Sequence, residues 1–140
     1  MTEESQSENN LYALTLLRDR LLPELLQDDE SNVLYWAGKE LARTISLTGI
    51  TALETFFMDA SFGLLTLISQ ADMTLQWRLE GPVVMSRLQD NESASFALEA
   101  GFLAEQVQQQ LGIGAEAQWE VRNQTIDITV MTDLPGTLAE

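Results

Sequence analysis

The side chains that could carry out chemistry are carboxylates, hydroxyls and a few basic groups, because the sequence contains no histidine and no cysteine. This absence excludes Cys/His zinc sites, haem held by histidine or thiolate, and catalysis by a histidine-activated or cysteine nucleophile. Disulfides and acyl groups carried on a thiol are excluded as well. We therefore expect no cofactor and no metal centre.

Three remaining arrangements could still bind a ligand or react. Residues 28–30 are all acidic, but a calcium loop starting there would place valine and lysine where glycine and glutamate are required. Paired carboxylates of the glycosidase type must converge in a cleft, whereas Glu116 and Glu120 alternate onto the wet face of a strand. Lys39 could act as a base only if it were buried, and its acidic neighbour favours solvent. We expect no enzymatic activity.

The net charge is −15, from 22 acidic and 7 basic residues. A surface this negative repels phosphate backbones and anionic lipid headgroups, so we expect no nucleic-acid binding and no membrane docking through a basic patch. No apolar run approaches the ~20 residues that a membrane span requires. The first ten residues are acidic and polar, unlike a signal peptide. We expect a cytoplasmic protein.

Apolar residues at three- and four-residue spacing predict four helices, at 11–22, 31–45, 51–59 and 93–111. Pro23 should end or kink the first helix. Gly38 lies inside the second helix, where it costs about 1 kcal/mol against alanine, which favours close approach of another backbone over a ligand contact. In the fourth helix, Ser93 or Ser95 can cap the start, and Glu99 is assigned with its polar neighbours to the wet face.

Period-two alternation predicts strands at 73–80, 115–122 and 125–130. The apolar run 62–69 predicts a central strand or a strand covered on both faces, and residues 83–85 are predicted to resume as an edge strand. The order favours an α+β fold, with one antiparallel sheet of two hairpins and four helices packed mainly on one face. Residues 11–131 should form a single domain. A flexible acidic tail is expected at 1–10, and a loose tail at 132–140.

Three segments, LLRDRLLPELL (16–26), LYWAGKELAR (34–43) and EGPVVMSRL (80–88), resemble the YslB-like family of small bacterial proteins of unknown function. With residues 93–131 included, the similarity spans roughly residues 11–131.

A looser similarity is to the vinyl-reductase-type ligand-binding domain, whose fold also occurs in the small subunits of the Golgi tethering complex TRAPP. It rests on the closing hairpin and on four short segments: Trp36-Ala37-Gly38, Phe62-Gly63, Ala100-Gly101-Phe102-Leu103 and Leu111-Gly112. This resemblance implies an α+β fold that commonly dimerises through its helices. Some members hold an apolar ligand between helices and sheet. The variants that use cysteine, for acylation or for a cysteine-rich site, do not carry over to a chain without cysteine.

Two hypotheses for the function follow. The first is a non-enzymatic interaction or scaffold domain, homodimeric through the helical face that carries Leu14, Leu17 and Leu21. The second is a non-covalent binder of a small apolar ligand, in a pocket between helices and sheet. Its lining would come from six aromatic residues that could equally form ordinary core: Trp36, Phe57, Phe62, Trp77, Phe96 and Phe102. The protein partner and the ligand are not specified by the sequence.

Overall fold

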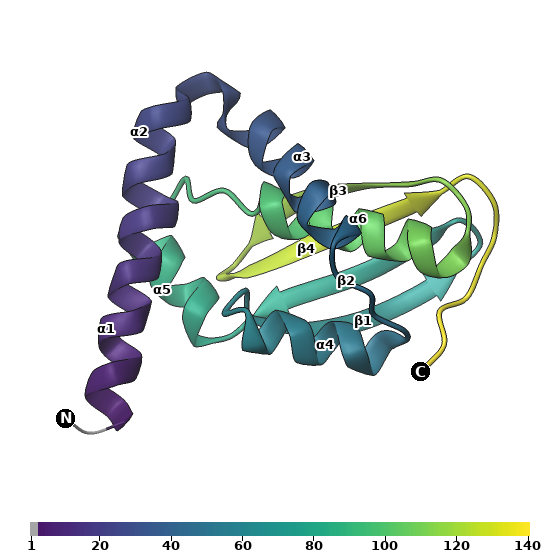
Figure 1. Ribbon diagram of the computed structural model, residues 1–140, viewed down its shortest axis with the longest axis horizontal. Helices are drawn as coiled ribbons and strands as arrows, with labels where there is room; N and C mark the ends of the chain where they lie inside the picture. The colour runs from purple at the N-terminus through teal and green to yellow at the C-terminus, as the bar shows by residue number, and fades with distance from the viewer. Residues whose placement is uncertain (1–2) are drawn as a thin grey trace.

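A four-stranded antiparallel sheet carries helices on one face in this computed structural model, which describes residues 3–140, with side chains from residue 8 onward (Figure 1). The strands are β1 (Leu64–Ala71), β2 (Thr74–Glu80), β3 (Ala115–Arg122) and β4 (Thr125–Thr132), in the spatial order β1-β2-β4-β3. The helices are α1 (Glu3–Thr15), α2 (Leu22–Leu26), α3 (Glu30–Arg43), α4 (Ile50–Asp59), α5 (Pro82–Asp90) and α6 (Ala97–Leu111). A π-helical turn, η1 (Leu16–Leu21), joins α1 to α2, and a 3₁₀ turn, η2 (Gln27–Asp29), precedes α3.

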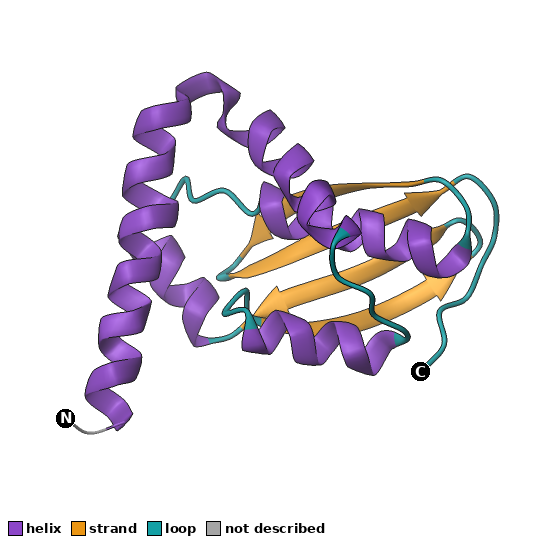
Figure 2. Cartoon of the chain, in the orientation of Figure 1, coloured by secondary structure: helices purple, strands orange, loops and turns teal. Residues whose placement is uncertain are grey.

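The sheet consists of two hairpins joined at its centre by β2 and β4, where Trp77 pairs with Ile128. One face is apolar and buried, and Trp77 and Ile128 both point into it. The other face is polar: Asp127 lies between Arg78 and Arg122, with N–O distances of 3.9 and 3.1 Å. The predicted α+β fold with a two-hairpin antiparallel sheet and its helices on one face is confirmed (Figure 2).

Helix α6 packs on the sheet beneath α3, and the two helices meet at glycines (Figure 1). A methyl group on Gly38 would overlap the carbonyl oxygen of Leu98, and one on Gly101 would overlap that of Tyr35. Only glycine allows the two backbones to approach this closely. The interpretation of Gly38 as a packing residue is therefore confirmed.

Helices α1, η1 and α2 form one continuous helical rod, residues 3–26, beside the end of the sheet (Figure 1). We call it the N-terminal rod. The sequence predicts a helix that begins at Leu11 and ends or kinks at Pro23. The rod instead begins before Leu11 and continues past Pro23 to Leu26. The proline cannot bond the Asp19 carbonyl four residues earlier, and the wide π-turn moves that carbonyl aside. The side chain of Asn91 donates to the Asp19 carbonyl instead, at 3.0 Å.

The structure differs from the sequence prediction at three further places. Strand β1, expected to be central or covered on both faces, lies at the edge of the sheet and is largely exposed. Residues 83–85 belong to helix α5, because Gly81 turns the chain with a φ of 105° and Pro82 suits the first helical turn. The C-terminal segment is packed in place: Leu138 is buried, and Ile50 N–H donates to the Ala139 carbonyl at 2.8 Å. The first amides of α4 have no partner within their own helix, which explains this contact.

The two predicted tails are therefore ordered over much of their length. Residues 3–10 are helical, and residues 1 and 2 lie outside the described part of the chain. None of the helices in the described part is long and apolar enough to cross a membrane.

Candidate interaction surface and the buried ionic network behind it

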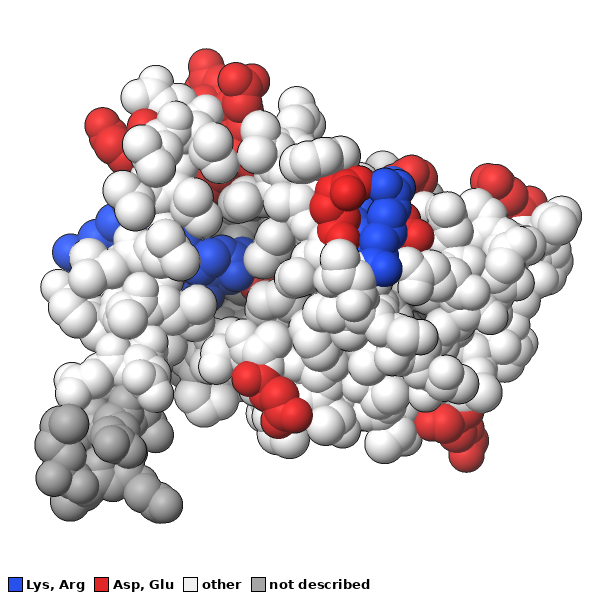
Figure 3. All heavy atoms as spheres, viewed as in Figure 1, with Lys and Arg blue, Asp and Glu red and all other residues white. Residues whose placement is uncertain are grey.

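Arg87, from α5, lies at the centre of a buried ionic network that ties the N-terminal rod to the body. Its guanidinium donates to the Asp19 carboxylate in η1, with N–O distances of 2.8, 3.1 and 3.2 Å. It also donates to Glu99 in α6 at 3.1 Å and to the Ser95 carbonyl at 2.7 Å. One planar cation thus joins the N-terminal rod to α5 and α6, although Asp19 is 68 positions away from Arg87 in the sequence. In Figure 3, basic and acidic atoms lie together in a recess between the rod and the body.

A second arginine completes the network. Arg18 Nη2 donates to Glu99 at 2.8 Å, so each Glu99 oxygen accepts from a different arginine. Burial alone would raise the pKa of the Glu99 carboxyl, but the Arg18 and Arg87 charges outweigh burial and hold that pKa below its usual range. Burial alone would lower the pKa of Arg18, but the charge of Glu99 and the hydrogen bond to it outweigh burial and raise that pKa. Both groups are therefore charged in the folded protein.

Glu30, at the start of α3, lies at the edge of this network without a full set of partners. Its Oε2 atom is buried and makes no hydrogen bond to any described residue, and the same holds for Arg18 Nε. The pKa of Glu30 is raised, first by its own burial and then by the negative charge of Asp19. The network thus contains one acid whose charge is poorly compensated.

The opposite side of the rod is apolar and exposed. Five large side chains lie on it with between 39% and 66% of their surface accessible: Tyr12, Leu16, Leu17, Leu21 and Leu25. We call this set the outer stripe. Its core is Leu17, Leu21 and Leu25, which follow one another at four-residue intervals along the helix. Large apolar side chains gathered on one side of a helix mark a contact surface more often than scattered ones do.

The predicted dimer face is divided by the structure. Leu17 and Leu21 lie in the outer stripe, whereas Leu14 is partly buried and lines a cleft with Pro82 and Val83. The π-turn is the cause, since it uses more residues per turn than the α-helix on which the prediction depends. The three leucines therefore do not share one face.

The six aromatic residues predicted to line a ligand pocket lie in two places. Trp36 is on the surface, with 62% of its area accessible, and the other five are buried in the core. Phe57, Phe62 and Phe102 contact one another edge to face, with ring centroids 5.2 to 6.1 Å apart. Phe96 packs against Trp119, and the Arg87 guanidinium lies 4.2 Å from its ring centroid. The ligand-lining role of these residues stays a prediction.

A smaller polar cluster joins α3 to the edge of the sheet. Lys39 donates to both oxygens of Glu116, at 2.6 and 2.7 Å, and the Tyr35 hydroxyl donates to the same carboxylate. Burial and the bond to Glu116 raise the pKa of Tyr35. Burial would raise the pKa of Glu116, but the bonds from Lys39 and Tyr35 outweigh it and lower that pKa. Lys39 and Tyr35 thus hold the Glu116 carboxylate at the junction of α3 and β3.

The polar neighbours of Glu99 in the sequence predict that it lies on the wet face of its helix, whereas the structure buries that residue completely, so the network is not predicted. A signal was present: Glu99 lies three residues after Phe96 and four before Leu103, within the apolar stripe. Its partners Arg18 and Arg87 are two of only 7 basic residues. Their pairing is non-local and leaves no periodic trace.

Comparison with known proteins bears on the family and the fold. Residues 11–131 match the model of a family described as "Protein of unknown function (DUF2507)". Over 129 residues the chain is 39% identical to the uncharacterized protein YslB of Bacillus subtilis (strain 168), covering 91% of this chain and 87% of that protein. The predicted YslB-like resemblance is therefore confirmed.

Two solved structures share the fold at low sequence identity. The phenol-responsive sensory domain of the transcription activator PoxR, crystallised with phenol, superposes with a TM-score of 0.62 at 13% identity, over 87% of this chain and 74% of that one. A vinyl-4-reductase family protein from Methanocaldococcus jannaschii gives 0.58 at 17% identity, over 91% of this chain and 80% of that one. The resemblance to TRAPP subunits stays a prediction. The chain belongs to the DUF2507 family of proteins of unknown function, of which the YslB protein is a relative, and it has a fold that is also found in a ligand-binding sensory domain.

Proposed function

We propose that this chain is a non-enzymatic interaction domain of the cytoplasm, and that it forms a homodimer through the outer stripe of its N-terminal rod. The observation that carries the proposal is the stripe itself, because five large apolar side chains are accessible on one side of one helical element. The buried ionic network supports it, since it fixes the rod's rotation with these side chains outward. Burying a leucine fully contributes about 1.5–3 kcal/mol, so a few of them can drive association.

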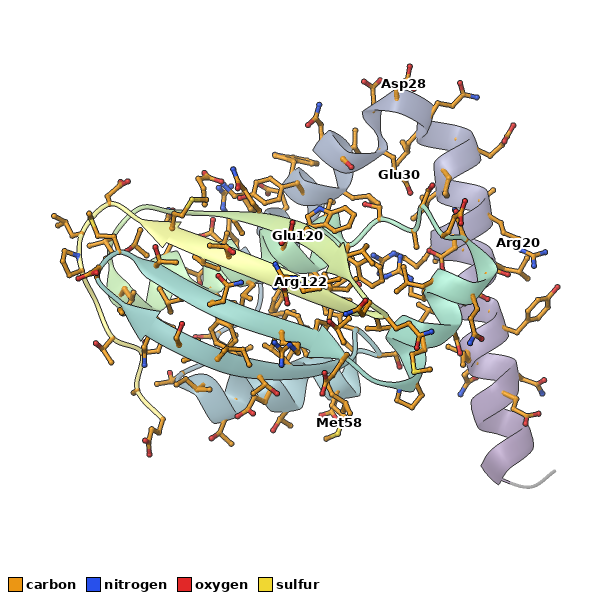
Figure 4. The ribbon with its side chains drawn as sticks, turned by 180° about the vertical axis from the view of Figure 1, so that it is seen from behind. Arg20, Asp28, Glu30, Met58, Glu120 and Arg122 are labelled. Carbon is orange, nitrogen blue, oxygen red and sulfur yellow. The ribbon has the colours of Figure 1, made fainter. Side chains whose placement is uncertain are left out.

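Charge placement favours a second copy of the chain as the partner. Arg20 and Glu24 each follow a stripe leucine by three residues, which places both on the same flank of the rod. In an antiparallel helix pair with its two-fold axis at Leu21, this flank faces itself. Arg20 of one copy then lies near Glu24 of the other. Figure 4 shows Arg20 on the outer side of the rod, where its guanidinium also donates to Asp90 of α5 at 2.7 Å.

The test is sedimentation velocity at micromolar concentration on three proteins. We expect a dimer for the natural sequence. Leu21→Glu places a charge in the centre of the stripe and should weaken association at least about 100-fold, as substitutions at interface centres do. Leu134→Glu is the matched control: it makes the same change at a leucine with 59% of its surface accessible, against 50% for Leu21, in the segment after β4. Circular dichroism should show all three to be folded.

A natural protein that sediments as a monomer would refute the homodimer. Equal weakening of association by Leu21→Glu and Leu134→Glu would refute the stripe as the contact surface. The weakening would then come from one more negative charge on a chain whose net charge is already −15.

One observation favours ligand binding as a second candidate function. Trp77 is completely buried between sheet and helices, yet its Nε1–H finds no acceptor among the described residues. A buried donor without a partner costs about 1–3 kcal/mol, and a small molecule with an oxygen acceptor would remove that cost. The PoxR domain, which shares this fold, was crystallised with phenol, a molecule of that kind.

Phenol is therefore the probe for this second function. Native mass spectrometry of the purified protein should show retained small-molecule mass, and phenol titration should change tryptophan fluorescence. Trp77→Phe removes the unpaired donor and should weaken phenol binding about tenfold, the equivalent of one hydrogen bond. Absence of both retained mass and a phenol response in the natural protein would refute this candidate.

A further inference from the structure

We propose that the open part of the β3 edge, at Trp119 and Val121, binds an extended basic segment of a partner protein as an added strand. This surface is separate from the outer stripe, and its occupancy does not depend on the homodimer. Three features of the described residues carry the proposal: the direction of the backbone amides, a groove beside them, and the charges around both.

The backbone amides show which way the edge faces. β3 is the last strand of the sheet, paired only with β4. Ala115 N–H donates to Gln108 Oε1 at 3.2 Å, and Ala117 N–H donates to the Tyr35 hydroxyl at 2.8 Å, so both amides point away from β4. Because backbone direction alternates along a strand, the N–H and C=O groups of Trp119 and Val121 also point outward. No described side chain accepts from either amide, so side chains cover half of the edge and leave the other half open.

A groove of about 490 Å³ lies beside residues 116–119 of β3, which include Trp119 of the open part of the edge. It runs between the start of α3 and β3, and its lining comprises Ser31, Asn32, Tyr35, Ala97 and residues 116–119. Tyr35 closes one end, because its hydroxyl is already bonded to Ala117 and Glu116. The Trp119 ring is held against Phe96, with centroids 5.9 Å apart. The groove thus meets the open part of the edge at Trp119. Added strands bind open sheet edges through backbone hydrogen bonds, with pockets for alternate side chains.

The charges around the groove select a basic segment. Glu116 and Glu120 lie on β3, and the acidic run 28–30 immediately precedes the α3 residues of the lining. Each of the basic residues nearby pairs with one of the strand acids, Lys39 with Glu116 and Arg122 with Glu120, whereas no described basic side chain pairs with Asp28 or Asp29. Figure 4 labels Asp28 at the turn before α3, Glu30 at the start of α3, and Glu120 and Arg122 on β3. An incoming strand with lysine or arginine at alternate positions would compensate the excess negative charge.

Two capped peptides of equal charge test the proposal by ¹H–¹⁵N NMR titration. The probe is Lys-Val-Lys-Val-Lys, and the control is Lys-Pro-Lys-Pro-Lys, which lacks two of the amides that an added strand needs. We expect the valine peptide to shift the amide signals of residues 118–121 and the Trp119 indole signal, and the proline peptide to shift them much less. Glu120→Lys should weaken valine-peptide binding roughly threefold to tenfold. Glu80→Lys makes the same charge change at an exposed site on β2 and should weaken it little.

Three results would overturn the proposal. Equal binding of the two peptides, or equal loss in Glu120→Lys and Glu80→Lys, would reduce the effect to attraction between a basic peptide and an acidic protein. Shifts confined to other surfaces would place the peptide elsewhere. Shifts at residues 118–121 that grow with protein concentration in the absence of peptide would make a second copy the occupant. Titrating Leu21→Glu in parallel keeps these outcomes distinct from the proposed homodimer.

Discussion

Replacing Arg87 by methionine should destabilise the protein more than any other single change to its charged residues. The substitution keeps most of the side chain's volume and removes its charge. The Asp19 carboxylate is left buried without a side-chain partner, since Arg87 is the residue in the described part of the chain whose side chain donates hydrogen bonds to it. Glu99 keeps Arg18, and the Ser95 carbonyl loses its contact at 2.7 Å.

The expected magnitude follows from these contacts. Breaking a buried ion pair by removing one partner costs about 3–5 kcal/mol, mostly for the uncompensated charge. The lost bond to the Ser95 carbonyl adds about 1 kcal/mol. We therefore expect a loss of roughly 4–6 kcal/mol, a large part of the 5–15 kcal/mol that a domain usually has. Arg87→Lys keeps the charge but not the planar fork, and should lose about half as much.

The assay is urea unfolding followed by circular dichroism at pH 7 and one fixed protein concentration, because any dimer adds concentration-dependent stability. Arg78→Met is the matched control, since it removes an exposed arginine that lies 3.9 Å from Asp127 on the polar face of the sheet. We expect no measurable change in its unfolding midpoint, because exposed pairs contribute little. If Arg87→Met and Arg78→Met shift the midpoint equally, the network does not hold the rod. Asp19→Asn in the Arg87→Met background should recover part of the loss.

Three further predictions concern packing and pH. Gly38→Ala should lower the free energy of unfolding by more than about 2 kcal/mol, because the added methyl group meets the α6 backbone. In an exposed helix the same substitution would raise it by about 1 kcal/mol. Calorimetry should show a lower Tm, and a raised Tm would refute the close approach. The pKa of Glu99 is lower in the folded protein than in the unfolded chain, so its contribution is present above the unfolded pKa of about 4.3 and is lost as pH falls through the folded pKa; the urea midpoint should drop more steeply below pH 5 in the natural protein than in Glu99→Gln. The pKa of Glu30 is raised in the folded protein, so its favourable contribution to stability is present below the unfolded pKa and is lost as pH rises through the folded pKa. Glu30→Gln should therefore raise the urea midpoint at pH 7 and leave it unchanged near pH 4. A midpoint lowered at pH 7 would contradict the poor compensation of the Glu30 charge.

The sheet could be predicted from sequence because its signal is local. In β2, Leu75, Trp77 and Leu79 alternate with polar residues, and the structure buries these three and leaves their neighbours on the other face. Each strand needs only its own pattern to be recognised. The same holds for the glycine contact between α3 and α6, since a glycine inside a helix has few uses other than close approach.

The rod could not be predicted because its geometry depends on residues far away in the sequence. Asp19 and Arg87 are 68 positions apart, and nothing near either residue identifies the other. The π-turn is equally hidden. It lies just before Pro23, which cannot bond the Asp19 carbonyl, and the side chain of the distant Asn91 donates to that carbonyl instead. The C-terminal segment shows the same limit: it carries two leucines, of which Leu134 is exposed and Leu138 buried, and its fixed position depends on free amides at the start of α4.

The rod buries charges and exposes leucines because breaking its buried ion pairs would cost more than burying the leucines would contribute. One residue corresponds to about 100° of helix rotation, so a rod turned by one position would bring Leu17 inward in place of Arg18. Each leucine buried in this way would contribute about 1.5–3 kcal/mol. The same rotation would remove Asp19 and Arg18 from Arg87 and Glu99, and stranding such buried partners costs about 3–5 kcal/mol for each broken pair. Two pairs outweigh two leucines, so the network sets the rotation, and the leucines remain outside as the surface through which the proposed dimer would form.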